Sequence, residues 1–577
     1  MEARISNLRE RIYAAKGEVP ADLVLKKGRV VNVCSGRIHE GDVAIHQGRI
    51  VGLGPRYQGK KEVDIEGKWV VPGLMDAHIH IESSMLLPSK LAEALLPRGT
   101  TTIVADPHEI ANVMGAQGIE FMLEESRDLP FDIFFMAPSC VPATHMETSG
   151  AEMDASALLP FRKNKRILGL AEMMNYPGVL AGDADVLEKL IIFREKRVDG
   201  HSPSLKGFDL QGYVAAGIGS DHETSEPGEG WEKLDSGMML MIREGTSAKN
   251  MEALLPIAME GNSHRCCFVS DDLHAQDIQG RGHLNYVIRM AIQQGLDPVT
   301  AVQMATLNPA EYMGLKDRGA VAPGYRADLV VLSDLESFSV DQVYKDGQLV
   351  FNDGVLIPFP ERRPPSIAFG PLNTGSLAPS RFHIENGSGN ARIIELVAGE
   401  ILTRTTLDRV KSEKGGVVAD IERDILKLAV IERHQGTGRT GMGLVRGFGL
   451  QGGAIASSVA HDSHNVIVVG TNDRDMCHAA ETLRDMGGGM VAVRSETTLA
   501  KVPLQVAGLM SVESVDVLVK QLNTLEQEVA SLGCSISDPF MRLSFLALPV
   551  IPQLRLTDRG LVDVDAFDFV PLFVQDR

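Results

Sequence analysis

The stretch Val71-Pro-Gly-Leu-Met-Asp-Ala-His-Ile-His80 is the part of this sequence that decides the fold. It places two histidines, His78 and His80, one residue apart behind an apolar run with the pattern of a β-strand. Alternate residues of a strand point to one side, so both imidazoles can reach a single metal ion. Two ordinary surface or core histidines also give a His-x-His pair, so the metal interpretation depends on the rest of the chain.

Eight short apolar runs alternate along the chain with segments of helical periodicity, at crossovers of roughly 20 to 35 residues. This alternation predicts a parallel (β/α)8 TIM barrel, an α/β fold whose active site forms at the carboxyl ends of its strands. The expected strands span residues 69–74, 101–105, 133–137, 167–171, 198–200, 217–219, 238–242 and 266–270.

Polar side chains that can bind metal fall directly after these runs, at the expected active-site face. The predicted ligands are His78, His80, Glu172, His201, His222 and Asp271. Four imidazoles and two carboxylates exceed the needs of one tetrahedral ion, so we expect two ions that share a bridging carboxylate, for which Glu172 is the natural choice. Nitrogen and oxygen donors without a thiolate fit manganese, iron or zinc. Two close cations would hold a hydroxide at neutral pH, which predicts metal-assisted hydrolysis.

Two further groups of residues leave alternatives open. Asp106, His108 and Glu109 follow the second run and are candidate catalytic residues, although Asp106 before Pro107 also fits a helix N-cap. After the eighth run, spacing alone does not decide whether Asp271 or its neighbour Asp272 faces the metals. We prefer Asp271 because it is the first residue past the run.

At these residues the chain resembles the amidohydrolase superfamily and, more closely, its adenine deaminase family. The resemblance extends over nearly the whole chain. Many amidohydrolases place a carboxylated lysine after the fourth strand, whereas this sequence has Glu172 and no lysine there, as the adenine deaminase branch does. The motifs that carry it are Pro72-Gly-Leu-Met-Asp-Ala-His-Ile-His-Ile-Glu-Ser-Ser84, Ala105-Asp-Pro-His-Glu-Ile-Ala-Asn112, Ser270-Asp-Asp-Leu-His274 and Ala456-Ser-Ser-Val-Ala-His-Asp-Ser-His-Asn465.

The resemblance implies hydrolytic deamination of adenine to hypoxanthine and ammonia in purine salvage, with two divalent ions and a bridging hydroxide that attacks C6 of the ring. Asp271 is then the expected base that moves a proton from the hydroxide to the leaving amine, and Glu109 is the candidate acid for a ring nitrogen. A hydrolase of cyclic amides is the alternative within the superfamily, but Glu172 and the carboxylates near Asp106 argue against it. A non-catalytic scaffold would be expected to have lost ligands, yet all six positions are filled.

Composition agrees with a cytoplasmic enzyme that acts on a small molecule. The 577 residues exceed one core, and a net charge of −19 argues against binding nucleic acid or an anionic membrane. The six cysteines form no CxxC pair or evenly spaced framework, which indicates reduced thiols. No run reaches the length of a transmembrane helix, and the amino-terminal residues lack the apolar core of a signal peptide. We expect a homodimer.

The flanks of the barrel predict further domains. Residues 21–31, 327–332 and 343–350 alternate apolar and polar residues around glycine turns, which indicates a small β-sandwich domain built from both flanks. The expected division is 1–70 for the amino-terminal helix and first part of that domain, 71–312 for the barrel, 313–356 for the second part, 357–374 for a proline-rich linker and 375–577 for an α+β domain.

The carboxyl-terminal domain contains a motif that imitates a nucleotide site. Gly436-Thr-Gly-Arg-Thr-Gly441 satisfies GxGxxG, but the segment behind it is too rich in glycine to open a long helix, so we expect no nucleotide cofactor. His461 and His464 fit either metal ligands or ordinary loop residues. We expect the domain to be architectural and to border the active site.

Overall fold

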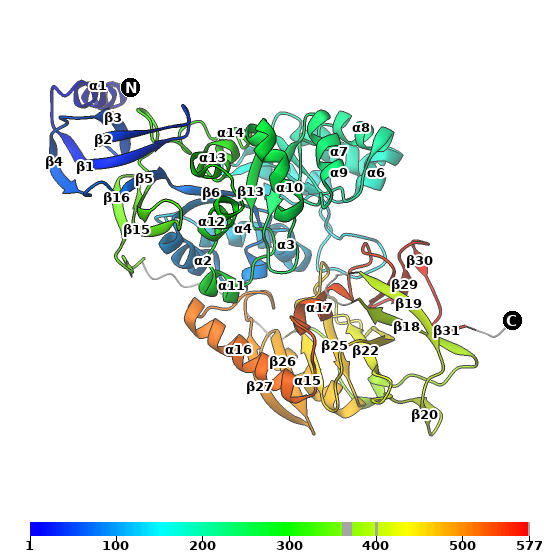
Figure 1. Cartoon of the computed structure of the whole chain (residues 1–577). Coiled ribbons are helices and arrows are strands. Elements are labelled where there is room, and N and C mark those ends of the chain that lie inside the picture. Colours follow the sequence, from blue (N-terminus) through cyan, green and yellow to red (C-terminus); the bar gives the residue numbers. More distant parts are fainter. Residues whose placement is uncertain (360–371, 398–401, 575–577) are drawn as a thin grey trace.

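The computed structural model describes residues 1–359, 372–397 and 402–574, so most of the predicted linker at 357–374 lies outside the described residues. Figure 1 shows a barrel surrounded by helices, a small β domain at the amino-terminal end of the chain, and a carboxyl-terminal domain packed against the barrel. No helix within the described ranges is long and apolar enough to cross a membrane.

The central domain is a closed barrel of eight parallel strands, which confirms the predicted fold class. The hydrogen-bonded orders β10-β9-β8-β7-β6 and β11-β12-β13 are joined at one seam by Gly219, whose amide donates to the carbonyl of Val198 at 3.0 Å. At the other seam the Asp271 amide donates to the carbonyl of His78, also at 3.0 Å. The barrel strands are β6 (Leu74–Ile79), β7 (Thr100–Ala105), β8 (Asp132–Ala137), β9 (Ile167–Met173), β10 (Arg197–Gly200), β11 (Ser220–Asp221), β12 (Met239–Arg243) and β13 (Cys266–Val269).

Two of the predicted strands are wrong in their bounds. The run 69–74 is divided between β5 (Trp69–Pro72), which belongs to the small β domain, and β6, the first barrel strand. Val70 and Val71 are as buried as the residues of β6, so hydrophobicity gives no sign of the boundary. At Gly73, between the two strands, an added Cβ would lie 2.2 Å from Thr101 Oγ1. The sixth strand is β11, which begins directly after the predicted run 217–219.

Helices follow the barrel strands along the chain and surround the barrel (Figure 1). The helix at 284–293 shows the amphipathic pattern most clearly, because it buries Leu284, Val287, Ile288 and Ala291. The main ones are α2 (Pro88–Leu95), α3 (His108–Met114), α4 (Ala116–Glu125), α5 (Ala155–Leu158), α6 (Tyr176–Ala181), α7 (Ala184–Phe193), α8 (Gly207–Ala215), α9 (Pro227–Asp235), α10 (Met251–Ile257), α11 (Ala275–Gly280), α12 (Leu284–Gln293), α13 (Pro298–Met304) and α14 (Leu307–Tyr312).

The small β domain joins both flanks of the barrel, as predicted. Its sheet runs β17-β16-β15-β14-β5-β1-β2-β3, with β4 paired to β1, and β5 pairs antiparallel with β14. Helix α1 (Glu2–Ala15) lies against this sheet, and its Ala14 belongs to the same buried hydrophobic cluster as Val24 of β1. The strands are β1 (Ala21–Asn32), β2 (Arg37–His46), β3 (Arg49–Gly54), β4 (Gly59–Asp64), β14 (Leu329–Asp334), β15 (Ser339–Lys345), β16 (Gln348–Asn352) and β17 (Val355–Leu356).

The carboxyl-terminal domain is built around a sheet of order β19-β18-β23-β22-β25-β24-β26-β27, with β31 paired to β18. The segment 436–441 leads directly into the strand β23, whereas a dinucleotide fingerprint opens a helix. The main elements are β18 (Asn390–Leu396), β19 (Thr403–Asp408), β22 (Ile425–Ile431), β23 (Thr440–Arg446), β24 (Ala454–Ser457), β25 (Val466–Gly470), α15 (Asp473–Asp485), β26 (Gly489–Arg494), β27 (Thr497–Pro503), α16 (Val515–Ser531), α17 (Pro539–Phe545), β28 (Leu554–Thr557), β29 (Gly560–Asp563), β30 (Asp568–Phe569) and β31 (Phe573–Val574).

Hydrogen bonds from two separate regions fasten this domain to the barrel. In the loop after β8, Thr148 Oγ1 donates to Asp558 Oδ2 at 2.7 Å, and Asn465 Nδ2 donates to the Thr148 carbonyl at 2.8 Å. Gln276 on α11 donates to Glu526 on α16 at 2.9 Å, and these two helices lie side by side in Figure 1. The loop that carries His461 and His464 is thereby held at the barrel.

Candidate metal centre and catalytic site

The first barrel strand places the His-x-His pair. His78 lies in β6 and His80 directly after it, with the apolar Ile79 between them. Below the pair, Asp76 accepts hydrogen bonds from the His78 amide at 3.1 Å and from Ser270 Oγ at 2.6 Å, and it lies 2.9 Å from His283 Nε2. These buried contacts join the carboxyl ends of β6 and β13 and fix the backbone that carries the histidines.

The Glu172 carboxylate, in β9, lies between two pairs of imidazoles. Its Oε2 is 2.7 Å from His201 Nδ1 and 3.2 Å from His222 Nε2. Its Oε1 is 3.3 Å from His80 Nε2. All of these side chains are buried except His201, which is 26% exposed. Because each oxygen faces a different histidine group, Glu172 has the geometry of a bridging ligand.

Asp271 completes the ring of strand ends. Its Oδ1 lies 3.1 Å from His80 Nε2 and 3.4 Å from His78 Nε2, whereas the Asp272 carboxylate accepts a hydrogen bond from Ser83 at 2.5 Å. His78 and His222 stack with ring centroids 4.1 Å apart. All six predicted ligands therefore meet at one face of the barrel. A carboxylate oxygen of Asp272 also lies within 4.8 Å of the ligand atoms of His80 and Asp271, but the ion-pair contacts with His78 and His80 come from Asp271.

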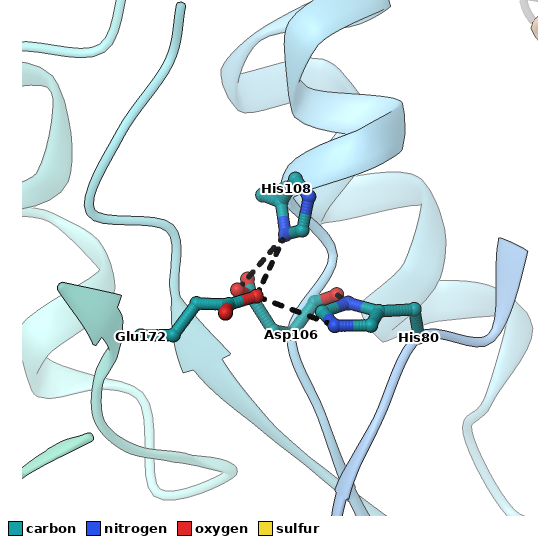
Figure 2. Close-up of side chains that lie close together, drawn as sticks. All are labelled: His80, Asp106, His108 and Glu172. Carbon is teal, nitrogen blue, oxygen red and sulfur yellow. Dashed lines mark hydrogen bonds and ion pairs between the residues drawn. The ribbon is translucent and has the colours of Figure 1, made fainter. Parts of the chain in front are cut away.

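The loop after β7 adds Asp106 and His108 to this group (Figure 2). His108 Nδ1 lies 3.0 Å from Asp106 Oδ2 and 3.6 Å from Glu172 Oε1, while the Asp106 carbonyl contacts His80 Nδ1 at 3.2 Å. Helix α3 begins at His108, and the Ile110 amide in its first turn donates to Glu82, not to Asp106. Asp106 is therefore not a helix cap; it orients His108 and, through its carbonyl, His80.

Arg243 and Glu223 belong to the site but were missed in the sequence. The Arg243 guanidinium contacts Asp271 Oδ2 at 2.5 Å and also bonds to Glu223, whose Oε1 lies 3.4 Å from His222 Nε2. Burial opposes ionisation of Asp271, yet the Arg243 charge and the histidines hold its pKa well below the usual range. Arg243 ends β12 and Glu223 follows β11, so the strand-end rule that selected the metal ligands could also have found these two.

Glu109 makes contacts that cross between domains. Its Oε1 is 2.6 Å from His461 Nδ1, and its Oε2 contacts His464 Nε2. Both histidines come from the carboxyl-terminal domain, and all three side chains are almost fully buried. Next to them, Glu82 accepts a hydrogen bond from the Ile110 amide at 3.1 Å, and burial followed by the Glu109 charge raises the pKa of Glu82 to about 7.

The donor set fits a divalent transition-metal centre. It offers imidazole nitrogens and carboxylate oxygens without thiolate, at positions close enough for shared coordination: the ligand atoms of His78, His222 and Asp271, and those of Glu172, His201 and His222, lie within 4.8 Å of one another. His78 Nε2 is buried and makes no hydrogen bond within the described part of the chain. Buried polar atoms are normally satisfied, and a cation between the histidine and the carboxylates would satisfy this one.

Comparison with known proteins agrees with this geometry. Residues 69–350 match the amidohydrolase family, and residues 400–568 match the adenine deaminase C-terminal domain. An adenine deaminase from Desulfatibacillum aliphaticivorans is 51% identical over 97% of this chain and 99% of its own length. One from Dehalococcoides mccartyi strain 195 is 45% identical over 98% of this chain and 99% of its own. Among solved structures, a beta-aspartyl dipeptidase from Fervidobacterium islandicum AW-1 is 17% identical with a TM-score of 0.45, over 59% of this chain and 99% of that chain.

Proposed function

We propose that this chain, which belongs to the adenine deaminase family, deaminates adenine at a binuclear metal centre built from its strand-end histidines and carboxylates. Its activity is the hydrolysis of adenine to hypoxanthine and ammonia, and its barrel is that of the amidohydrolases. The observation that carries the binuclear proposal is the position of Glu172, whose two oxygens face different histidine groups.

Two divalent ions would be held by His78, His80, Glu172, His201, His222 and Asp271. When bound, such ions lower the pKa of water and supply a nucleophile at neutral pH. Manganese or iron is our proposal, with zinc as the third candidate, because all three accept mixed nitrogen and oxygen donors. Apart from His201, the carboxylates and histidines that would hold the ions are buried, which limits access of bulk water and fixes the geometry of the site.

Asp271 is our candidate for moving a proton between the attacking oxygen and the leaving amine. Its Oδ1 faces the histidine pair, and its Oδ2 is held by the Arg243 guanidinium. The Arg243 charge keeps the carboxylate ionised, so Asp271 can accept a proton from the nucleophile and hand it to the amine as that group departs. Arg243 also fixes the direction of the accepting oxygen.

Glu109 is our candidate for protonating a ring nitrogen as negative charge develops on the purine. It stands one residue past His108, whose Nε2 lies 3.7 Å from Glu109 Oε1, so it borders the histidine group without belonging to the six proposed ligands. Asp106 and His108 support this side of the site by orienting each other and contacting Glu172. An acid here helps a substrate that has a basic ring nitrogen conjugated to the attacked carbon.

The direct test is release of ammonia from adenine by purified protein loaded with manganese or iron(II), with bound metal measured in the same sample by elemental analysis. Turnover of adenine with close to two ions per chain is the expected result. Hydrolysis of hydantoin or dihydroorotate far ahead of adenine would instead favour a cyclic amidohydrolase.

Three broader proposals remain. The six cysteines all lie in the described part of the chain and none forms a disulfide, which supports the reducing cytoplasm as the compartment of the protein. A role in purine salvage is proposed from the family resemblance. A homodimer is proposed from the family resemblance alone. Light scattering of the purified protein would measure its mass directly.

A further inference from the structure

We propose that His461 of the carboxyl-terminal domain stores the proton that Glu109 passes to the purine ring, and that His464 holds Glu109 in place for this transfer. This inference rests on the proposed function and assigns the carboxyl-terminal domain a part in the chemistry. Both histidines act through Glu109 and are therefore positioning residues.

Hydrogen bonding fixes the tautomer of His464. The Ala460 amide donates to His464 Nδ1 at 3.2 Å, so that nitrogen carries a lone pair and no proton. The single proton of a neutral imidazole must then lie on Nε2, which donates to Glu109 Oε2. Burial lowers the pKa of His464 to about 4, although the Glu109 charge opposes this shift. His464 is therefore neutral near pH 7. A metal site formed by Glu109, His461 and His464 would need a free lone pair on Nε2, which this tautomer does not offer.

His461 is in the opposite state. Its Nδ1 lies 2.6 Å from Glu109 Oε1, and its ring stacks on Phe545 of α17 with centroids 4.9 Å apart. Burial would lower the pKa of His461, but the carboxylates of Glu109, Asp272 and Asp462 outweigh it and raise the pKa to about 9. The imidazole is therefore protonated at neutral pH and presents its N–H to Glu109.

The same contacts leave Glu109 without a proton of its own. Burial raises the pKa of Glu109, but the charges of His461 and His108 hold it well below the usual range. A carboxylate cannot act as an acid unless a neighbour supplies the proton. His461 Nδ1 lies 2.6 Å from Glu109 Oε1, closer than His108 Nε2 at 3.7 Å, and is therefore the nearer proton donor.

The transfer balances over one turnover. The N–H bond at His461 Nδ1 breaks while an O–H bond forms at Glu109 Oε1, and the electron pair stays on the imidazole nitrogen. The O–H bond then breaks as an N–H bond forms at the ring nitrogen next to the attacked carbon. Water provides both hydrogens overall: the proton it loses on becoming the nucleophile returns to His461, and its second proton leaves with ammonia through Asp271.

The test uses the full-length, metal-loaded protein with His461→Gln. Glutamine keeps an N–H that can donate to Glu109 but has no proton to transfer. We expect kcat for adenine to fall by about 100-fold or more, the range of general acid catalysis, with unchanged metal content and little change in KM. The matched control is His478→Gln, because His478 is a histidine of the same domain that contacts Thr498 at 3.2 Å and has no recorded contact to Glu109. It should behave as the wild type.

Two further measurements separate this role from a structural one. The loss in the double variant His461→Gln with Glu109→Gln should not exceed the loss in Glu109→Gln alone, because both act on one proton. In the wild type, kcat/KM should fall as pH rises through about 9, where His461 loses its proton, and that fall should be absent from His461→Gln.

Each contrary result overturns the inference. Turnover by His461→Gln within about threefold of the wild type would refute the proton-storage role. Additive losses in the double variant would also refute it, because residues that act on one proton should give non-additive losses. If His461→Gln does not fold, the pH profile of the wild type alone decides: a kcat/KM that does not fall as pH rises through about 9 would refute the inference. Ammonia release by the wild type and His478→Gln preserves the proposed function in all these cases, whereas no release from adenine by either protein would refute that function itself.

Discussion

Replacing Asp271 by asparagine separates the two tasks that its carboxylate performs. One oxygen faces His78 and His80, and the other accepts from Arg243 at 2.5 Å. Asparagine has only one acceptor oxygen. If that oxygen stays on Arg243, the amide NH2 faces the histidines and cannot accept a proton; if it turns to the histidines, the NH2 meets the guanidinium donor. Either orientation loses one task.

The expected loss follows from the role of a proton acceptor. General acid–base groups contribute about 10²- to 10⁴-fold to rate, which corresponds to about 3 to 5.5 kcal/mol of activation free energy. The fold should be retained, because Asp271 has a φ of 57° and asparagine adopts this left-handed region as readily as aspartate. Arg243 also keeps its partner Glu223 in the variant.

The control is Asp272→Asn, because the ion-pair contacts with His78 and His80 come from Asp271, whereas the Asp272 carboxylate bonds to Ser83. Its kcat should stay within about tenfold of the wild type, because an amide oxygen can still accept the Ser83 hydroxyl. Ammonia release from adenine, bound metal and thermal unfolding would be measured on both variants. A larger loss of kcat in Asp272→Asn than in Asp271→Asn, at equal metal content, would refute the assignment of the base to Asp271.

Three further predictions test the bridging role of Glu172, the acid role of Glu109 and the contribution of Asp132 to the stability of the fold. Glu172→Gln should keep the fold but reduce activity by more than the roughly 10- to 100-fold that outer partners of metal ligands contribute, and full wild-type activity with one ion per chain would contradict the binuclear centre. Glu109→Gln should cut adenine turnover by about 100-fold at unchanged metal content, with cyclic amides remaining poor substrates and adenosine turnover low in both proteins; comparable adenosine turnover would show a pocket open at N9. Asp132 is 27% exposed, and although burial opposes its ionisation, Lys345 and Arg318 lower its pKa to about 2, from 3.8. Asp132→Asn should therefore cost at most about 2 kcal/mol of unfolding free energy at pH 7, a difference that shrinks as pH falls from about 4 through 2, as chemical denaturation at each pH would measure.

The barrel and the six candidate ligands at its strand ends could be predicted because their signals are local. Strand ends of a parallel barrel meet at one face, so a polar residue directly after an apolar run is placed without knowledge of side-chain packing. Bounds were harder to predict: β5 and β6 are both buried and separated only by Gly73, so hydrophobicity alone merges them. Arg243 directly follows the predicted run 238–242 but was missed, because a guanidinium has no lone pair to offer a metal ion.

The partners of Glu109 could not be predicted in the same way. His461 and His464 reach it across more than 350 residues of sequence. Nothing in their spacing distinguishes a pair that holds a carboxylate from two ordinary loop histidines. That distinction depends on the docking of the carboxyl-terminal domain, through contacts such as Thr148 with Asp558, which involve residues common in any loop.

The density of buried charge explains why a second domain is needed at the mouth of the barrel. Burying a carboxylate is costly unless a cation or strong donors accompany it. Arg243 accompanies Asp271 and Glu223, and His461 and His464 accompany Glu109. Metal ions would serve Glu172 in the same way. Without the carboxyl-terminal domain, Glu109 would lose both of these partners and face water, where its pKa would rise toward the ordinary value; a barrel alone could keep the proposed metal ligands but not the paired state of Glu109.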